Sequence, residues 1–230
     1  MRGGDIIYAA LTGDLVGSTQ LPPARSRGAM ASLKAAADAF AGRHPGAVVG
    51  SMDTFRHDSW QLLLGVPALA LRAALYLRTV LKRESDADIK YDTRVSIGIG
   101  EVEWISRQRI SDSRGPAFTR SGKGLDAMGS RCFALDAGEA DSGGMAALAN
   151  AAVPLLDCVV GDWTPAESRA VHGVLNGLTQ EEIARQWPPV GKNGRTPSRQ
   201  AVGDALVRAH WSTVAEVLGW IEAGLGAPGR

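Results

Sequence analysis

The chain has 230 residues, and its 25 Lys and Arg balance 24 Asp and Glu to leave a net charge of about +1. This balance excludes a uniformly basic nucleic-acid coat but not a local basic patch. Hydrophobic residues make up 45% of the chain, and no apolar run approaches the ~18 residues of a membrane span, so we expect a globular cytoplasmic protein without a membrane partner.

The first third of the chain predicts a strand, a helix and a hairpin. Residues 6–11 form a continuous apolar run, which is typical of a strand buried on both faces. Helix-forming residues fill 22–43 and end before Pro45. The segments 47–52 and 59–66 have extended character and predict a hairpin.

The middle of the chain continues the alternation. Pro67 opens a helix that is expected to reach about residue 83. The stretch 91–105 alternates like a strand, and Gly98 and Gly100 within it predict a close approach by another element. A helix over 115–128, a strand over 132–135 and a helix over 144–157 are expected to follow. The order predicts an α+β sandwich of ferredoxin-like type.

Composition changes after this part. Four of the six tryptophans lie in the last ~70 residues, where no strand pattern is found. We therefore expect two domains, 1–160 and 161–230, the second small and all-α. Capping boxes begin at Thr164 and Thr179, and Ser198 can cap a further helix, whose apolar stripe runs to residue 221.

Two carboxylates in the first domain are candidate metal ligands. Asp14 ends the first strand and Asp58 lies near the hairpin tip. Two carboxylates beside a phosphate-binding turn can hold Mg²⁺, although both residues are also ordinary turn formers. The expected phosphate ligands are the backbone amides after Asp14, which belong to Leu15, Val16, Gly17, Ser18 and Thr19. Arg94, on a predicted strand, could contact a phosphate, but an exposed arginine on a strand is more often solvated, and that is the expectation here.

Four segments in this order resemble motifs of the SatD-like family, in which a class III nucleotide cyclase-like domain precedes a helix-turn-helix. They are Gly13-Asp14, Asp58-Ser59-Trp60-Gln61, Ile97-Gly98-Ile99-Gly100-Glu101 and Gly115-Pro116-Ala117-Phe118. The resemblance implies a cyclase-homology domain with a nucleotide ligand, Mg²⁺ at the two aspartates, and a site formed between the subunits of a homodimer.

The sequence departs from active cyclases at two places. His57 stands where the family has Gly. The helix over 118–125 lacks the usual Asn and offers Arg120 and Lys123 as cations for the nucleotide. Because phosphoryl chemistry depends on a preorganised cation, nucleotide binding without cyclisation is favoured, and no catalytic residue is assigned.

The C-terminal part resembles a helix-turn-helix over 178–184 and 198–202. Residues 185–208 hold five basic residues against one acidic residue. Ser198, Arg199 and Gln200 are placed to begin a recognition helix that reads base edges. The expected phosphate contacts are Lys192, Arg195 and Arg208. The intervening 188–197 is longer than a usual turn, so an all-helical dimerisation module is the alternative.

Together these patterns predict a nucleotide-responsive, DNA-binding transcriptional regulator whose ligand is a linear or cyclic nucleotide. Two other functions stay open. One is an active Mg²⁺-dependent nucleotide cyclase with a helical dimerisation tail. The other is a module without ligand, in which the cyclase-like fold only dimerises.

Overall fold

A five-stranded sheet forms the centre of the molecule in the computed structural model, which describes residues 6–138, 144–189, 194 and 196–226. The strand order is β2-β3-β1-β4-β5, and only the β4–β5 pair is parallel. The strands are β1 (Ile7–Leu15), β2 (Val48–Phe55), β3 (Ser59–Leu64), β4 (Thr93–Glu101) and β5 (Phe133–Asp136). The fold is therefore mixed α+β, as the sequence predicts.

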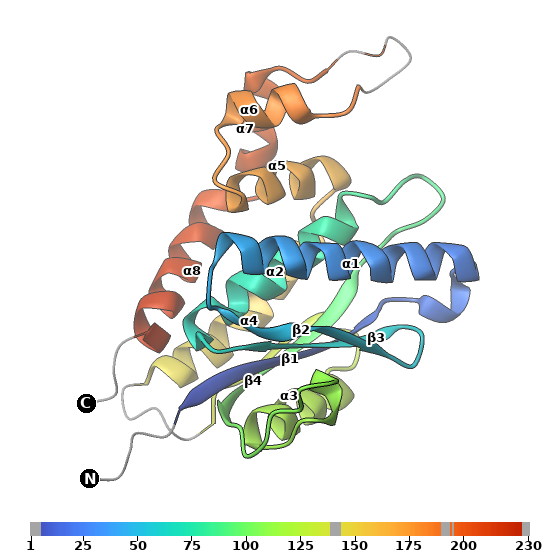
Figure 1. Cartoon of the computed structure of the whole chain (residues 1–230). Helices are drawn as coiled ribbons and strands as arrows, with labels where there is room; N and C mark the ends of the chain where they lie inside the picture. The colour runs from blue at the N-terminus through green and yellow to red at the C-terminus, as the bar shows by residue number, and fades with distance from the viewer. Residues whose placement is uncertain (1–5, 139–143, 190–193, 195, 227–230) are drawn as a thin grey trace.

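Helices cover both faces of this sheet (Figure 1). Helices α1 (Pro23–Arg43) and α2 (Ala70–Lys82) lie on one face, and α3 (Pro116–Ala127) lies on the other. Leu11 in β1 belongs to the large core under α1 and α2, whereas its neighbour Ala10 packs in the smaller core with α3. The continuous apolar run of β1 is thus explained by burial on both sides.

Gly98 allows α3 to lie directly on β4. A Cβ atom at Gly98 would lie 2.2 Å from the carbonyl oxygen of Ala117, at the start of α3. At Gly100 it would lie 2.5 Å from the Arg120 guanidinium. The close approach predicted from the two glycines is confirmed.

Five helices follow the fifth strand: α4 (Met145–Gly161), α5 (Pro165–Leu175), α6 (Gln180–Gln186), α7 (Arg199–Arg208) and α8 (Trp211–Gly226). One hydrophobic cluster runs from Leu71 in α2 through Val160 and Val171 to Leu218 in α8. Arg72 and Glu222 join α2 to α8 by an ion pair of 2.6 Å. The core thus continues across residue 160, and the domain boundary there stays a prediction.

The helices begin at the predicted capping residues, but the last predicted helix is divided in two. Thr164 and Thr179 each form a complete capping box, and the Ser198 hydroxyl accepts from the Ala201 amide. The stripe that continues to residue 221 is divided between α7 and α8, because His210 adopts a left-handed φ of 51°. The Trp163 indole donates to the Ala209 carbonyl at 2.9 Å and so satisfies one of the free carbonyls at the end of α7.

In the part of the chain that the structure describes, no helix has the length and apolar character needed to cross a membrane.

Candidate functional site

Asp14 and Asp58 line one cavity of about 340 Å³, which we call the carboxylate cavity. The β1–β3 register brings the end of β1 beside the hairpin, and the Leu15 amide donates to the Asp58 carbonyl at 3.0 Å. The remaining lining residues are Leu15, Val16, Gly17, Ser18, Thr19, Arg94, Gly129, Ser130 and Cys132. The two predicted metal ligands and the predicted phosphate-binding turn therefore lie together.

A tight hairpin tip and a hydroxyl hold Asp58 in place. The Ser18 hydroxyl donates to Asp58 Oδ2 at 2.6 Å, which links the turn after β1 to the hairpin. Arg56 and His57, just before Asp58, have left-handed φ values of 54° and 61°. Such φ values are unfavourable for residues with a Cβ, so the hairpin tip that presents Asp58 is strained.

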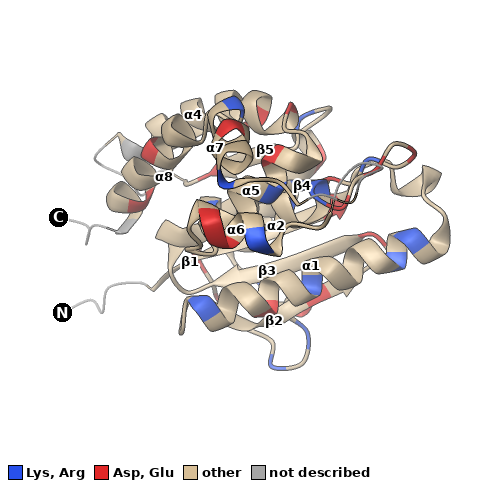
Figure 2. Cartoon of the chain, turned by 90° about the horizontal axis from the view of Figure 1, so that it is seen from above, with Lys and Arg blue, Asp and Glu red and all other residues tan. Residues whose placement is uncertain are grey.

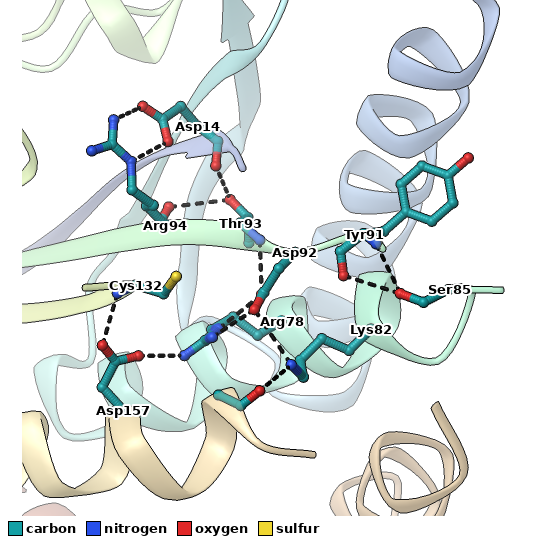
Figure 3. A network of polar contacts seen from close by, with 11 residues as sticks. Asp14, Arg78, Lys82, Ser85, Tyr91, Asp92, Thr93, Arg94, Cys132 and Asp157 are labelled. Atoms are coloured by element: carbon teal, nitrogen blue, oxygen red, sulfur yellow. Dashed lines mark hydrogen bonds and ion pairs between the residues drawn. The ribbon is translucent and has the colours of Figure 1, made fainter. Parts of the chain in front are cut away.

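Asp14 is paired with Arg94, contrary to the expectation that Arg94 is solvated. The two residues are cross-strand partners in the β1–β4 ladder. Arg94 Nε donates to Asp14 Oδ1 at 2.8 Å, and Nη2 donates to Oδ2, so the pair is bidentate (Figure 3). The hydrogen bond to Asp14 raises the pKa of Arg94 above its usual value. Arg94 therefore neutralises one of the two candidate metal ligands.

A buried ionic network supports this wall of the cavity (Figure 3). Arg78 in α2 is fully buried and donates to both oxygens of Asp92, at 2.9 and 2.6 Å, and to Asp157 in α4 at 2.8 Å. Burial alone would lower the pKa of Arg78, but Asp92 and Asp157 together keep it above its usual value. Asp157 also accepts from the Cys132 amide at 2.8 Å.

Thr93 connects this network to Asp14. Its amide donates to Asp92 Oδ1 at 2.8 Å, and its hydroxyl donates to the Asp14 carbonyl at 2.6 Å. The Trp60 indole in turn donates to the Thr93 hydroxyl oxygen at 3.0 Å. The backbone of Asp14 is thus held by buried groups from β3, β4, α2 and α4.

Arg120 and Lys123, the predicted nucleotide-binding cations, do not line the carboxylate cavity. They line another hollow of about 800 Å³, together with Glu103 and Asp136. Arg120 Nη1 donates to the Ile99 carbonyl at 2.5 Å, which directs the guanidinium along β4. The structure therefore does not bring them together with Asp14 and Asp58.

The predicted DNA-binding residues are divided in the structure. Ser198, Arg199 and Gln200 are exposed at the start of α7. Arg208 instead donates to Glu167 at 3.1 Å. Lys192 and Arg195 lie outside the described residues.

Helix α6, beside α7, carries both signs of charge. In Figure 2 basic and acidic segments stand next to each other on this helix, and Arg185 forms an ion pair with Glu181. The positive charge that remains unpaired in the described part of this region is therefore concentrated at Arg199.

The carboxylate cavity suits a magnesium ion that arrives with phosphates. The described residues include no group of three or more His, Cys, Asp or Glu side chains that could hold a metal alone. Mg²⁺ commonly takes one or two protein carboxylates and completes its shell with waters and substrate phosphates. Asp14 and Asp58 meet that requirement, with Arg94 as a competitor for Asp14.

No family model and no curated protein sequence matches the chain. Among solved structures, the chain is similar to one titled "Crystal structure of the guanylyl cyclase Cya2", with 18% identity and a TM-score of 0.43. The alignment covers 60% of this chain and 82% of the other. A likeness of this size carries no argument about function.

Proposed function

We propose that the chain is a nucleotide-responsive, DNA-binding regulator whose carboxylate cavity binds a nucleotide together with Mg²⁺. One observation carries the proposal: Asp14, Asp58 and the turn 15–19 line a single cavity. The β-α-β-β-α-β order over residues 7–101, with β1 between β3 and β4, supports a ferredoxin-like, cyclase-like domain. The motif resemblance adds SatD-like membership to the proposal.

In this proposal each group has one task. Asp14 and Asp58 hold Mg²⁺, which neutralises the phosphate charge, and the amides of 15–19 donate to phosphate oxygens. The Ser18 hydroxyl orients Asp58 through its hydrogen bond. Arg94 shields Asp14, so Mg²⁺ would have to compete with its guanidinium for that carboxylate.

Binding without turnover follows from where the other cations lie. Cyclisation needs a cation facing the charge that develops on the phosphoryl group. Arg120 and Lys123 line a different hollow, and Arg94 is engaged with Asp14. A sensor role therefore fits the cavity better than an enzymatic one.

The C-terminal helices supply the DNA-binding half of the proposal. Arg199 and Gln200 are exposed at the start of α7, where a recognition helix contacts base edges. A homodimer would present two copies to two half-sites of an operator. We expect duplex affinity to fall steeply with salt, and Arg199→Ala to relax sequence preference while Lys34→Ala, at an exposed α1 position, leaves it unchanged. Salt-independent binding, or no binding to any duplex, would support a dimerisation module instead.

An active cyclase is the second candidate, because both aspartates that cyclisation needs share the cavity. Incubation with the four nucleoside triphosphates and Mg²⁺, followed by mass spectrometry, separates the two functions. We expect the nucleotides to remain unchanged over hours. A cyclic product that disappears in Asp58→Ala would establish the cyclase instead.

A further inference from the structure

A second cavity, of about 390 Å³, lies where α1 and α2 meet α5 and α6. Three guanidinium groups line it: Arg43 from the end of α1, Arg83 after α2, and Arg169 from α5. Its other lining residues are Ala39, Tyr76, His172, Gly173, Asn176, Leu178, Ile183, Gln186 and Trp187. We call it the arginine cavity; no sequence motif pointed to it.

The positive charge of this cavity is not balanced within the described part of the protein. None of its lining residues is an Asp or Glu, and none of the three arginines has a carboxylate within ion-pair distance there. Arg43 donates to the Asn176 carbonyl and Arg169 to the Arg83 carbonyl, both at 2.8 Å. Neutral backbone acceptors anchor the guanidiniums without cancelling their charge.

The surroundings of Arg169 disfavour its charged form. Burial, and then the neighbouring Arg83, lower the pKa of Arg169, although Glu84 partly opposes this. Like charges held together at a partly buried site are unfavourable unless a counter-ion joins them. Binding of an anion among these three guanidinium groups is therefore expected to be favourable.

Three polar residues without negative charge also line the cavity, Tyr76, His172 and Asn176, and Thr79 lies behind His172. The Thr79 hydroxyl donates to the Tyr76 carbonyl at 2.8 Å, so its oxygen is left to accept from His172 Nδ1 at 3.2 Å. His172 therefore carries a proton on Nδ1, and because burial lowers its pKa to about 3, the ring is neutral near pH 7. Tyr76 donates from its hydroxyl to Asn176 at 3.1 Å. These buried groups are already ordered and add no carboxylate that would repel an anion.

We propose that the arginine cavity binds a small phosphate-bearing molecule, with the phosphate held by Arg43, Arg83 and Arg169. Planar guanidiniums donate in pairs to phosphate oxygens, which makes arginine the preferred residue for such groups. The volume exceeds that of one phosphate ion and leaves room for the organic part of a metabolite. A ligand there would join α5 and α6 to α1 and α2.

This site stands independently of the carboxylate cavity, with which it shares no lining residue. It also requires no metal, because the protein already supplies the positive charge. The two proposals can therefore fail separately, provided that the test is made without divalent cations.

The test is isothermal titration calorimetry of the full chain with inorganic pyrophosphate, in EDTA and at constant ionic strength. Arg83→Gln is the chosen variant because no hydrogen bond from the Arg83 side chain holds the described structure together. Arg27→Gln, at an exposed position of α1 outside the cavity, is the matched control. We expect Arg83→Gln to weaken binding about tenfold or more, as the loss of a charged hydrogen bond does, and Arg27→Gln to leave it unchanged.

Further arms identify the ligand chemistry. A nucleoside 5′-monophosphate and inorganic phosphate should compete with pyrophosphate, and a tricarboxylate of similar charge should compete poorly. Melting curves establish that each variant is folded. The proposal is overturned if pyrophosphate does not bind at millimolar concentration, if Arg27→Gln weakens it as much as Arg83→Gln, or if the tricarboxylate binds better than every phosphate.

Discussion

The two cavities differ in how the protein balances their charge. In the carboxylate cavity Asp14 is met by Arg94, and Asp58 by the Ser18 hydroxyl. In the arginine cavity the guanidinium groups meet backbone carbonyls and one another. In the first site one of the two carboxylates, Asp14, is neutralised before any ligand arrives, and a cation must compete with Arg94 for it. The second site carries excess positive charge, which a bound anion would neutralise.

Helix α2 and the residue after it show the same contrast within a short segment. Arg78 is fully buried and lies between Asp92 and Asp157. Arg83, just beyond the last turn, is half-buried and lines the arginine cavity together with Arg169. One arginine holds the structure together, and the other is available to a ligand.

The largest expected effect follows from this pair. Arg78→Met removes the cation from the partly buried Asp157 and leaves Asp92 with Lys82, at 3.6 Å, as its partner in the described structure, so the free energy of unfolding should fall by about 3–5 kcal/mol. Arg83→Gln, which removes repulsion, should change it by less than about 0.5 kcal/mol. Urea denaturation measures both values. Similar losses for the two variants would show that the arginines have the same structural role.

A pH effect of intermediate size is expected at the arginine cavity. Burial, followed by Arg83, Arg43 and Arg169, lowers the pKa of His172 from 6.5 to about 3. Below pH 6.5 His172 is therefore protonated in the unfolded chain but not in the folded chain. Acidification consequently lowers the free energy of unfolding. Between pH 7 and pH 5 this group alone costs about 2 kcal/mol. Between pH 7 and pH 5 the free energy of unfolding of His172→Gln should therefore fall by about 2 kcal/mol less than that of wild type, as urea denaturation at the two pH values would measure. Equal decreases in both proteins would contradict a lowered pKa of His172.

At the carboxylate cavity the expected change is in metal affinity. Arg94→Gln removes the cation that competes for Asp14, so Mg²⁺ without nucleotide should bind about tenfold more tightly, on the scale of one charged hydrogen bond. Calorimetric titration with MgCl₂ measures this, and Arg27→Gln controls for the change in net charge. Unchanged affinity in Arg94→Gln would mean that Asp14 is not a ligand.

The smallest effect concerns the hairpin tip. His57 has a φ of 61°, a conformation that glycine adopts without a Cβ penalty. His57→Gly should raise the free energy of unfolding by about 0.5–1 kcal/mol, the relieved strain less the added chain entropy. Denaturant titration of His57→Gly against wild type measures it. A loss of stability would show that the His57 side chain contributes more than its backbone strain costs.

Much of the fold could be predicted because its signals are local. The apolar run of β1, the capping residues Thr164 and Thr179, and the spacing of Gly98 and Gly100 each report on their immediate surroundings. Asp14 and Asp58 could be paired because a strand end and a hairpin tip meet wherever the strands are neighbours.

The rest depends on long-range register that no local pattern contains. The Asp14–Arg94 pair follows from the β1–β4 ladder, and the pairing of Arg78 with Asp157 requires α4 to lie beside α2. The arginine cavity joins residues of two parts of the chain, 39–83 and 169–187, that are far apart in the sequence. The sequence predicts Arg120 and Lys123 as nucleotide-binding cations only from their position in a helix. The direction in which α3 presents their side chains depends on how that helix packs on Gly98.

The most direct test of the central claim is calorimetric titration of the full chain with nucleoside triphosphates, with Mg²⁺ and with EDTA, in wild type, Asp58→Asn and Asp38→Asn. Asp38 is exposed on α1 and is the matched control. We predict binding that requires Mg²⁺, is lost in Asp58→Asn and is unchanged in Asp38→Asn. Equal binding by Asp58→Asn and wild type, or binding that EDTA does not affect, would contradict a magnesium–nucleotide site at the carboxylate cavity.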